Sequence, residues 1–506
     1  MPSYFLWRHF FIFTIKTIMS QAKELNRTLG LLDATSIVAG SMIGSGIFIV
    51  TASMVRDIGS AGWLLFLWLL TGLITVFAAL SYGELAGMMP KAGGQYVYIQ
   101  RAYGRMISFL YGWTVFTVIQ TGVIAAVAVA FAKYSAVFFT ELNYIVTTFS
   151  GIEITLQQVL AVLSIIFLTY INTRGVQNGK IIQLIFTSAK LFALFALIVL
   201  GLAFAFKTDT FSSNMTDMWN AGQTKILKNG DSIFVPLSGF ALLGVLGSTI
   251  INSLFSSDAW NNVTFIAGEI KDPKKNIPRS LFLGTLIVTI IYILANLAYL
   301  SLLPMKGDVH GTTAISQGIM FANQDRVGAS AASVIFGNIG VSIMALLIMI
   351  STFGCNNGLI LSGSRLFYAM SKDGLFFKKA NSLNKNNVPS TALWFQCLWA
   401  CLLCFSGQYG DLIKYSTFAS LLFYILTIAG IFVLRKKEPD LERPYKAFGY
   451  PYIPALYIIL TFSICVDLLI YDTKSVGMGL LIVLIGIPIY YLTNKKSDND
   501  LIEIDE

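Results

Sequence analysis

The sequence predicts an all-α membrane protein with twelve transmembrane helices, and its composition is the first observation behind that prediction. Of the 506 residues, 56% are apolar and only 12% are charged, and the mean hydropathy is +0.71. A soluble domain carries about 25% charged residues because its surface faces water. Half that fraction argues against a water-soluble enzyme, a disordered scaffold and a secreted disulfide-rich domain.

Long apolar runs are the second observation, and they place the helices. Crossing about 30 Å of hydrocarbon takes about 20 apolar residues, which must be helical to satisfy their backbone hydrogen bonds. The predicted spans cover residues 34–55, 62–87, 104–138, 156–172, 181–206, 236–267, 280–303, 332–362, 391–406, 411–434, 450–471 and 476–493. The ninth of these runs is shorter than a full span.

The third observation is the distribution of Lys and Arg between alternate loops. With a cytoplasmic N-terminus, the cytoplasmic segments hold 25 of the 35 Lys and Arg residues and the outer loops hold 8, while Lys133 and Lys190 fall within spans. Cytoplasmic loops of membrane proteins are enriched in these residues. Both termini are therefore predicted to be cytoplasmic, in a multi-pass protein of the plasma (inner) membrane. The net charge of +9 then reflects the loops rather than nucleic-acid binding.

The two ends of the chain are predicted to lie outside the helical core. Residues 1–27 form a cytoplasmic N-terminal segment, and residues 494–506 form a cytoplasmic tail. Residues 1–18 are too short and too polar to span the membrane. They are an interfacial anchor, a signal-like segment, or a start-site artefact with translation beginning at Met19, and we favour the last of these.

Two spans contain residues that a lipid-facing helix avoids, and the first reads SMIGSGIF from Ser41 to Phe48. Gly44 and Gly46 flank a serine near mid-span, and each weakens a helix by about 1 kcal/mol relative to Ala. The backbone can open there and direct free N–H groups at a ligand. Alternatively, Gly40 and Gly44 form a GxxxG motif that packs against another helix.

The sixth span is interrupted in a similar way, because residues 252–262 include one acid, three Asn and three Ser. Such groups face a cavity or a partner rather than lipid, or they form a polar face that joins helices. The breaks fall in spans 1 and 6, which indicates two five-helix halves with inverted topology. These repeats cover about residues 30–206 and 236–435 of a ten-helix core (28–435), which leaves helices 11 and 12 (436–493) peripheral.

A buried lysine and several other polar residues complete the candidate site. Lys190 lies about 15 Å from the cytoplasmic end of span 5, beyond the reach of its side chain to the surface, so we expect it to contact carbonyls at the first break. Lys133, nearer a membrane face, is expected to reach the surface. Glu84 is either a gate or proton-coupling group or an ordinary acid at the membrane edge. Asn356 and Asn357 either line the same cavity or form interhelical hydrogen bonds.

Residues that would carry enzyme or metal chemistry are scarce. The three cysteines that share a helical face, Cys397, Cys401 and Cys404, have no His beside them, so no metal or cofactor site is predicted. The only histidines are His9 and His310, and no HExxH or GxSxG motif is present. A membrane-embedded acyltransferase or protease is therefore disfavoured, because such enzymes need placed nucleophiles, bases or metal ligands.

Five motifs, in the same order, resemble the amino acid–polyamine–organocation superfamily, close to its L-type amino acid transporter branch and to bacterial members. They are GSMIGSGIF in span 1, SYGELAGMMPKAGGQYVYIQRAYG between spans 2 and 3, FTSAKLFALFALIVLG in span 5, LFSSDAWNNVTFIAGEIKDPKKNIPRS after span 6 and SRLFYAMSKDGLFF after span 8. The resemblance covers about residues 28–435. It implies a LeuT-like inverted-repeat transporter fold with discontinuous helices 1 and 6, and alternating access.

The resemblance also implies roles for particular residues. The backbone N–H groups of Ser45 and Gly46 would bind the substrate carboxylate, and the carbonyls of Met42 and Phe255 would receive its ammonium. Phe255 is similar to the aromatic gate over bound substrate, and Lys190 matches the lysine that replaces the second sodium site in sodium-independent members. The residues expected to bind substrate are Met42, Ile43, Gly44, Ser45, Gly46, Phe255, Ser257, Asp258, Trp260 and Asn261, with Lys190 and Glu84 at the cation site or in coupling.

Two departures from the family pattern bear on substrate and partner. L-type relatives often have two glycines after the helix 6 aromatics, where this chain has Asp258 and Ala259. Asp258 would attract a cationic side chain, contact the ammonium or bind a proton. The loop between spans 3 and 4 has no cysteine, so the heavy-chain disulfide of animal members is impossible there and the chain is expected to work alone.

The predicted function is secondary active transport of L-amino acids across the plasma membrane, without sodium and without a cofactor, as an exchanger or a proton symporter. A non-transporting amino acid sensor would share the same fold and site. A carrier of polyamines or cationic amino acids is a further alternative, which Asp258 would favour.

Overall fold

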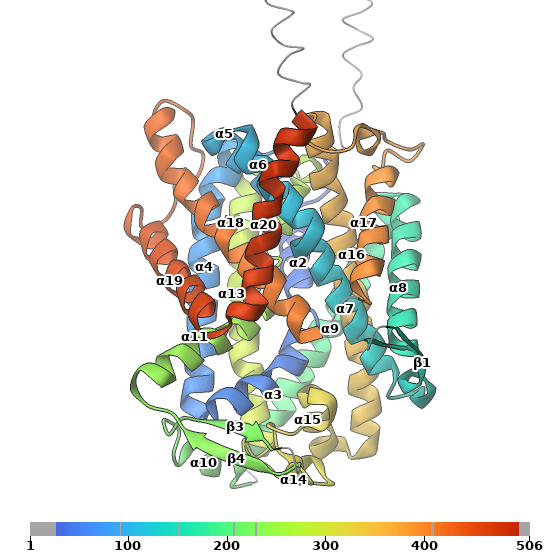
Figure 1. Ribbon diagram of the computed structural model, residues 1–506, viewed down its shortest axis with the longest axis vertical. Helices are drawn as coiled ribbons and strands as arrows, with labels where there is room; N and C mark the ends of the chain where they lie inside the picture. The colour runs from blue at the N-terminus through green and yellow to red at the C-terminus, as the bar shows by residue number, and fades with distance from the viewer. Residues whose placement is uncertain are drawn as a thin grey trace, which may run out of the picture.

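The computed structural model describes residues 27–91, 93–149, 152–205, 208–227, 230–405 and 409–494. Its helices run side by side along the longest axis of the molecule, and two β-hairpins lie toward one end of the bundle (Figure 1). The predictions for residues 1–18 and for the tail after Asn494 fall outside the described ranges.

Long apolar helices make up most of the fold because a helix satisfies its own backbone groups in lipid. Within the described ranges, eleven helical segments are long and apolar enough to cross a membrane. They are formed by α2 (Leu31–Met42) with α3 (Gly46–Ile58), α4 (Ala61–Met88), α6 (Arg105–Thr114) with the π-helix Val115–Ile119 and α7 (Gln120–Ser135), α8 (Leu156–Thr173), α9 (Val176–Ala205), α11 (Gly239–Ser256), α13 (Pro273–Leu302), α16 (Asn338–Lys372), α18 (Tyr409–Lys437), α19 (Tyr452–Tyr471) and α20 (Thr473–Asn494).

Shorter helices connect or flank these segments. They are α5 (Gln95–Tyr103), α10 (Thr210–Met215), α12 (Asn262–Phe265), α14 (Ala314–Gln317), α15 (Val327–Phe336) and α17 (Ser390–Leu403), together with the 3-10 helices Thr140–Asn143, Ala267–Glu269, Asn323–Asp325 and Lys378–Asn381. α17 occupies the ninth predicted span, and its 14 residues leave it shorter than a full crossing.

The eighth predicted span, 332–362, differs from the structure at both ends. Its first residues belong to α15, which ends at Phe336, and α16 continues to Lys372. Gly337 separates the two helices with a φ of +64°, a left-handed conformation that glycine adopts readily and that ends a helix. Apolar content alone did not reveal this break, because α15 is as apolar as the helix that follows it.

Two antiparallel hairpins, which the sequence did not predict, lie outside the helices of this all-α fold. β1 (Ile145–Phe149) pairs with β2 (Ile152–Thr155) between α7 and α8, and β3 (Gly222–Ile226) pairs with β4 (Ser232–Pro236) between α10 and α11. The first pair is rich in Ile, Val and Thr, which favour strands. Both hairpins lie in connections between membrane helices, where short strands satisfy their backbone groups locally.

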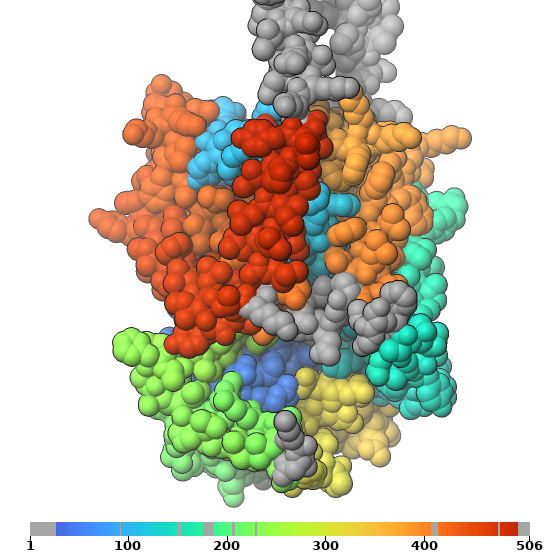
Figure 2. All heavy atoms as spheres, viewed as in Figure 1, coloured from blue at the N-terminus to red at the C-terminus, as the bar shows by residue number. Residues whose placement is uncertain are grey.

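The first helical segment lies at the centre of the bundle. In its most apolar stretch 89% of the residues are buried, against 28% in α19 and 17% in α20. α13 packs against α2, α4 and α9, and α16 packs against α7 and α9, so these helices surround the centre. The space-filling view shows α19 and α20 on the surface of the molecule (Figure 2). Their exposed apolar side chains suit contact with lipid.

Candidate functional site

The first candidate segment is the non-helical stretch between α2 and α3. α2 ends at Met42, and α3 begins at Gly46. Ile43 follows α2 with a ψ of 85°, which is outside the helical region. The stretch therefore leaves the last carbonyls of α2 and the first N–H groups of α3 without helical partners, at the place where Gly44 and Gly46 lower helix stability.

The last carbonyls of α2 are satisfied by side chains from three other helices. The Lys190 Nζ on α9 donates to the oxygens of Gly40 and Ile43, the latter at 2.7 Å. The remaining contacts come from Cys355 Sγ to Ser41 O at 3.2 Å, Ser351 Oγ to Ile43 O at 3.4 Å, and Tyr292 Oη to Met42 O at 3.0 Å. Such carbonyls otherwise have no intrahelical partner, and an ammonium is favoured at this negative end of the helix dipole.

Lys190 is completely buried, with 0% of its side chain exposed. Its amine is directed at the centre of the bundle through the two carbonyl contacts, so the side chain does not extend to a membrane face. A buried ammonium needs hydrogen-bond acceptors to offset its loss of hydration. Here the acceptors are the backbone oxygens that the end of α2 leaves exposed.

The second candidate segment lies between α11 and α12. α11 ends at Ser256, and Ala259 has a φ of +65°, an unusual conformation for a residue with a side chain. Asp258 Oδ1 accepts a hydrogen bond from Tyr424 Oη on α18 at 2.5 Å. Trp260 packs edge-to-face on Tyr82, with ring centroids 4.7 Å apart. The segment is therefore fixed by side chains from α4 and α18.

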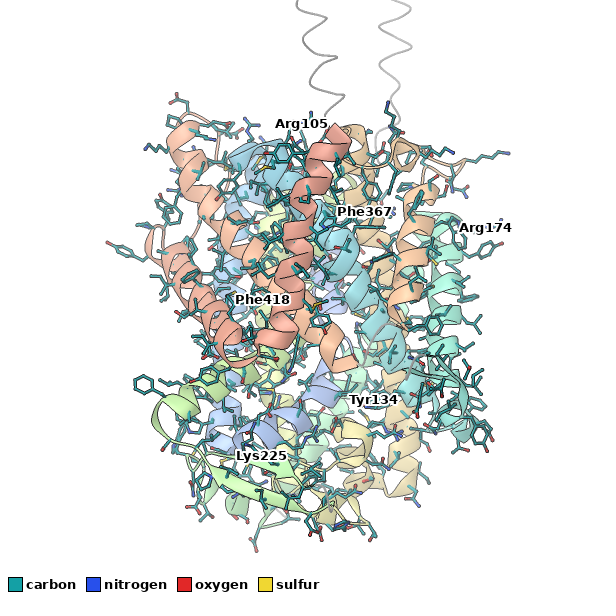
Figure 3. All side chains as sticks on the ribbon, viewed as in Figure 1. Arg105, Tyr134, Arg174, Lys225, Phe367 and Phe418 are labelled. Atoms are coloured by element: carbon teal, nitrogen blue, oxygen red, sulfur yellow. The ribbon has the colours of Figure 1, made fainter. Side chains whose placement is uncertain are left out.

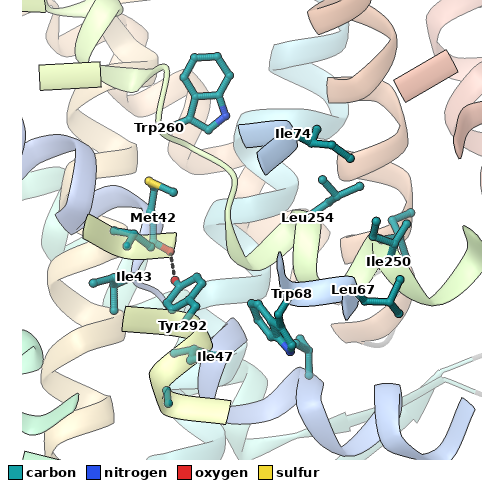
Figure 4. Packing of buried hydrophobic residues seen from close by; sticks show 14 of the residues in the cluster. Met42, Ile43, Ile47, Leu67, Trp68, Ile74, Ile250, Leu254, Trp260 and Tyr292 are labelled. Atoms are coloured by element: carbon teal, nitrogen blue, oxygen red, sulfur yellow. Dashed lines mark hydrogen bonds between the residues drawn. The ribbon is translucent and has the colours of Figure 1, made fainter. Parts of the chain in front are cut away.

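The helix ends that border the two non-helical segments touch each other. Gly46 lies against Ser256, and a Cβ atom added at Gly46 would fall 2.7 Å from the Ser256 Cβ and 2.9 Å from its Cα. Figure 4 shows the end of α2 beside Tyr292 and the chain leading to Trp260. Glycine is needed at position 46 because the backbone of α11 occupies the volume of any side chain.

Gly46→Ala is expected to lower the thermal stability of the purified protein in detergent, because overpacking against fixed backbone costs about 1–3 kcal/mol. Gly44→Ala is the matched control, since its new Cβ would meet only the Cys355 sulfur at 3.3 Å and a Val127 methyl at 3.9 Å. Melting curves of both variants test this. Equal stability of the two variants would contradict the close contact between Gly46 and Ser256.

Two cavities adjoin the second segment. The first lies between α5, α6, α7, α16 and α18, and the second between α4, α18 and α19; each has room for about 20 Å³. Asp258, Ser420 and Tyr424 line both of them. Of the residues expected to bind substrate, Ser257, Asp258, Trp260 and Asn261 line a cavity, whereas Met42, Ile43, Gly44, Ser45, Gly46 and Phe255 line neither.

Gln95, the first residue of α5, is a cavity residue that the sequence analysis missed. Its Oε1 accepts from Tyr111 Oη and Asn261 Nδ2, both at 2.9 Å, and its Nε2 donates to Thr427 Oγ1 at 3.0 Å. It therefore joins α6, the second segment and α18. The pair of glycines before it, Gly93 and Gly94, could have pointed to this position in the sequence. Gly94 has a φ of +46° and lies directly against Thr264, so a tight turn places Gln95 next to the second segment.

Glu84 lies in an ion-pair cluster rather than in either cavity. Its side chain is 1% exposed and receives Arg435 Nε at 2.9 Å, Arg435 Nη2 at 2.6 Å and the Ala447 N–H at 2.7 Å. Arg443 Nε lies 3.4 Å from the same carboxylate. A carboxylate held by two guanidinium groups favours a structural role, linking α4 to α18 and to the chain between α18 and α19.

Asn356 and Asn357 do not line either cavity. Asn357 Oδ1 accepts from Asn172 Nδ2 on α8 at 2.8 Å, which is the interhelical hydrogen bond of the second alternative. Cys397, Cys401 and Cys404 are free thiols, as are the other two cysteines.

Comparison with known proteins gives the family. A family model described as amino acid permease matches residues 29–490. The serine/threonine exchanger SteT of Bacillus subtilis is 30% identical over 475 residues, which are 93% of this chain and 98% of SteT. The large neutral amino acids transporter small subunit 2 of Rattus norvegicus is 32% identical, over 95% of this chain and 84% of that protein. The b(0,+)-type amino acid transporter 1 of Mus musculus is 28% identical, over 93% and 88%.

These relatives are transporters and not enzymes, and the match confirms the resemblance that the motifs indicated. It extends over the whole helical bundle, from the start of α2 to within α20. The chain therefore belongs to the amino acid permease family of membrane transporters.

Proposed function

We propose that this permease is a sodium-independent secondary transporter that moves L-amino acids across the plasma membrane by alternating access, as an exchanger or a proton symporter. The contact of the Lys190 ammonium with the carbonyls of Gly40 and Ile43 carries the proposal. Backbone carbonyls at an unwound helix are the ligands of coupling ions in such transporters. An amine already bound to them supplies that positive charge without sodium.

The proposed architecture has twelve transmembrane helices, with α17 as the ninth. Two inverted five-helix halves, about residues 30–206 and 236–435, form the core, and helices 11 and 12 are peripheral. Two observations support it: each half contains a helix that stops at the candidate site, at Met42 and at Ser256, and α19 and α20 are the least buried spans. Discontinuous helices that meet in mid-membrane place substrate at the interface of the repeats.

The proposed substrate site lies at the two non-helical segments. The N–H groups of Ser45 and Gly46 bind the carboxylate at the positive end of α3, and the carbonyls of Met42 and Phe255 bind the ammonium. The contact between Gly46 and Ser256 supports this arrangement, because it brings the two helix ends together. The substrate side chain then points toward Asp258 and the first cavity.

The proposed orientation puts both termini in the cytoplasm. The distribution of Lys and Arg supports it. Arg105 and Arg174, both in predicted cytoplasmic segments, lie in the half of the molecule opposite Lys225, which is in a predicted outer loop (Figure 3). The segment between α7 and α8 has no cysteine, and we propose that the protein works without a disulfide-linked heavy chain.

Uptake by proteoliposomes tests the proposal. L-serine is the first labelled probe, because one relative is named a serine/threonine exchanger. We expect uptake that does not respond to a sodium gradient and that rises either with unlabelled L-serine inside, for an exchanger, or with an inward proton gradient, for a symporter. Sodium-dependent uptake would overturn the role given to Lys190. Binding of L-serine without any counterflow would favour the sensor instead.

Transport of cationic amino acids is the second candidate, and Asp258 favours it. The carboxylate lines both cavities and would attract a cationic side chain. If the protein carries cationic amino acids, Asp258→Asn is expected to weaken the competition of L-arginine and L-lysine with labelled L-serine by about tenfold. Competition by neutral amino acids is expected to stay unchanged. Asp373→Asn is the matched control, because Asp373 also accepts from a tyrosine, Tyr96 Oη at 2.8 Å, but lines neither cavity.

Equal competition by L-arginine in the two variants would contradict this candidate. A panel of the twenty amino acids and putrescine, each tested against labelled L-serine, then defines the substrate class.

A further inference from the structure

Basic side chains cluster at the start of α13. Between positions 271 and 279 the exposed basic residues are Lys271, Lys274, Lys275 and Arg279, and the exposed acid among them is Asp272. Lys274 is already paired, because its Nζ lies 2.9 Å from Glu442 Oε2. Within the part of the chain that the structure describes, Lys275 and Arg279 form no ion pair. Their two positive charges are therefore available to a ligand.

Lys275 and Arg279 lie on the side of α13 that faces lipid. Further along the same helix, Leu283, Ile287 and Ile290 are 38%, 41% and 49% exposed, in a segment long and apolar enough to cross a membrane. At about 100° per residue, these five side chains fall within an arc of about 120°. Lys274 lies outside that arc, toward Glu442. A basic end thus continues directly into an exposed apolar stripe.

Contacts with α4 place the basic end of this stripe at the boundary of the membrane. A Cβ atom added at Gly83 would lie 3.2 Å from the Pro278 Cβ, and Gly83 is about 7 Å before the end of α4. From Arg279 to Leu302, its last residue, α13 rises about 35 Å, slightly more than the thickness of the hydrocarbon, which is about 30 Å. Arg279 therefore lies at the level of the lipid headgroups.

We propose that this face of α13 binds an anionic phospholipid of the cytoplasmic leaflet. The Arg279 guanidinium and the Lys275 ammonium donate to the phosphate of the headgroup, and the acyl chains lie along the exposed apolar stripe. A free phosphate ion would use the basic end alone, whereas a phospholipid uses both parts of the face. The choice of leaflet follows from the proposed orientation, and the binding itself does not depend on transport.

The lipid site adjoins the chain that joins the second candidate segment to α13. Glu269 O accepts the N–H groups of Thr28 and Leu29 at 2.9 and 3.0 Å, and Lys271 N donates to Leu29 O at 2.8 Å. The first described residues of the chain are therefore attached beside the basic cluster. A lipid that binds this folded arrangement, and not the unfolded chain, stabilises it.

Native mass spectrometry of the purified full chain tests the proposal, with phosphatidylglycerol and phosphatidylcholine of equal acyl length as the two probes. We expect phosphatidylglycerol to be retained about tenfold more tightly, because basic residues near the membrane surface attract anionic headgroups. The double variant Lys275→Gln, Arg279→Gln is expected to lose this preference. Lys274→Gln is the matched control, because Lys274 is exposed in the same turn but is paired with Glu442, and it is expected to keep the preference.

Thermal unfolding in detergent gives a second measurement. Phosphatidylglycerol is expected to raise the Tm of the unchanged protein and of Lys274→Gln, but not that of the double variant. A Tm of the lipid-free double variant equal to that of the unchanged protein would show that the lost preference is not a loss of folding. The variant Lys275→Arg, Arg279→Lys keeps both charges and is expected to retain the preference.

Equal retention of the two lipids by the unchanged protein would refute the site. A preference that survives in the double variant would also refute it, because the lipid would then bind elsewhere. Displacement of bound phosphatidylglycerol by inorganic phosphate would assign the basic end to free phosphate and overturn the role of the apolar stripe. These outcomes leave the proposed transport function untouched, since none of them measures uptake.

Discussion

Lys190→Ala is expected to abolish amino acid uptake while the protein still inserts into the membrane and purifies as a folded species. The substitution removes the donor to Gly40 O and Ile43 O at the buried end of α2. Ile43 O keeps its contact with Ser351, but Gly40 O loses its side-chain donor and the end of α2 loses its positive charge. A cost of about 3 kcal/mol in the transport cycle corresponds to a fall of about a hundredfold in uptake. Initial rates in proteoliposomes, normalised to inserted protein, measure the effect.

Lys133→Ala is the control for that experiment, because Lys133 also falls within a predicted span and belongs to the last turn of α7, where its side chain is partly exposed. Its uptake is expected to match that of the unchanged protein. Uptake by Lys190→Ala that becomes stimulated by sodium would support the amine as the substitute for a coupling ion. Normal sodium-independent uptake by Lys190→Ala would refute the role of the amine.

Glu84→Ala is expected to destabilise the fold strongly, because it leaves Arg435 and Arg443 without their buried carboxylate. Breaking a buried ion pair by removing one partner costs about 3–5 kcal/mol. Thermal unfolding in detergent measures the loss. Glu442→Ala is the control, since its pair with Lys274 is mostly exposed and such pairs contribute little.

Glu84→Gln separates this structural role from proton coupling. The amide keeps one acceptor for Arg435 but removes the charge, so an intermediate loss of stability is expected, with any proton dependence of uptake unchanged. A fully stable Glu84→Gln protein that has lost only its response to a proton gradient would restore Glu84 as the coupling group.

The residues at which α2 and α11 end could be singled out from the sequence because they break a rule of membrane helices. Glycine pairs, carboxylates and lysines are unfavourable in an apolar helix, so Gly46, Asp258 and Lys190 stand out against the residues around them. The apolar runs likewise placed most of the helices, because the thickness of the bilayer sets their length.

The contacts made by Tyr292 and Gln95 could not be predicted in this way. Tyrosine is common in membrane helices, and its partner carbonyls, 250 and 36 residues away, become neighbours only through tertiary packing. The bond from Gln95 to Thr427 likewise joins residues 332 positions apart. The hairpins and Gly337 were missed because short strands and a single left-handed glycine leave weak sequence patterns.

The π-helix Val115–Ile119 determines which residues of the third membrane segment face the first cavity. Tyr111 and Gln120 both line that cavity, although nine residues of regular α-helix would turn them about 180° apart. The π-turn absorbs one surplus residue, which brings the two side chains to within about 80° of each other. A regular α-helix through the same residues would rotate α7 by about 100° relative to α6 and carry Gln120 and Val123 away from the cavity wall. Deleting one residue from the turn would instead remove the surplus residue and keep the two side chains about 80° apart.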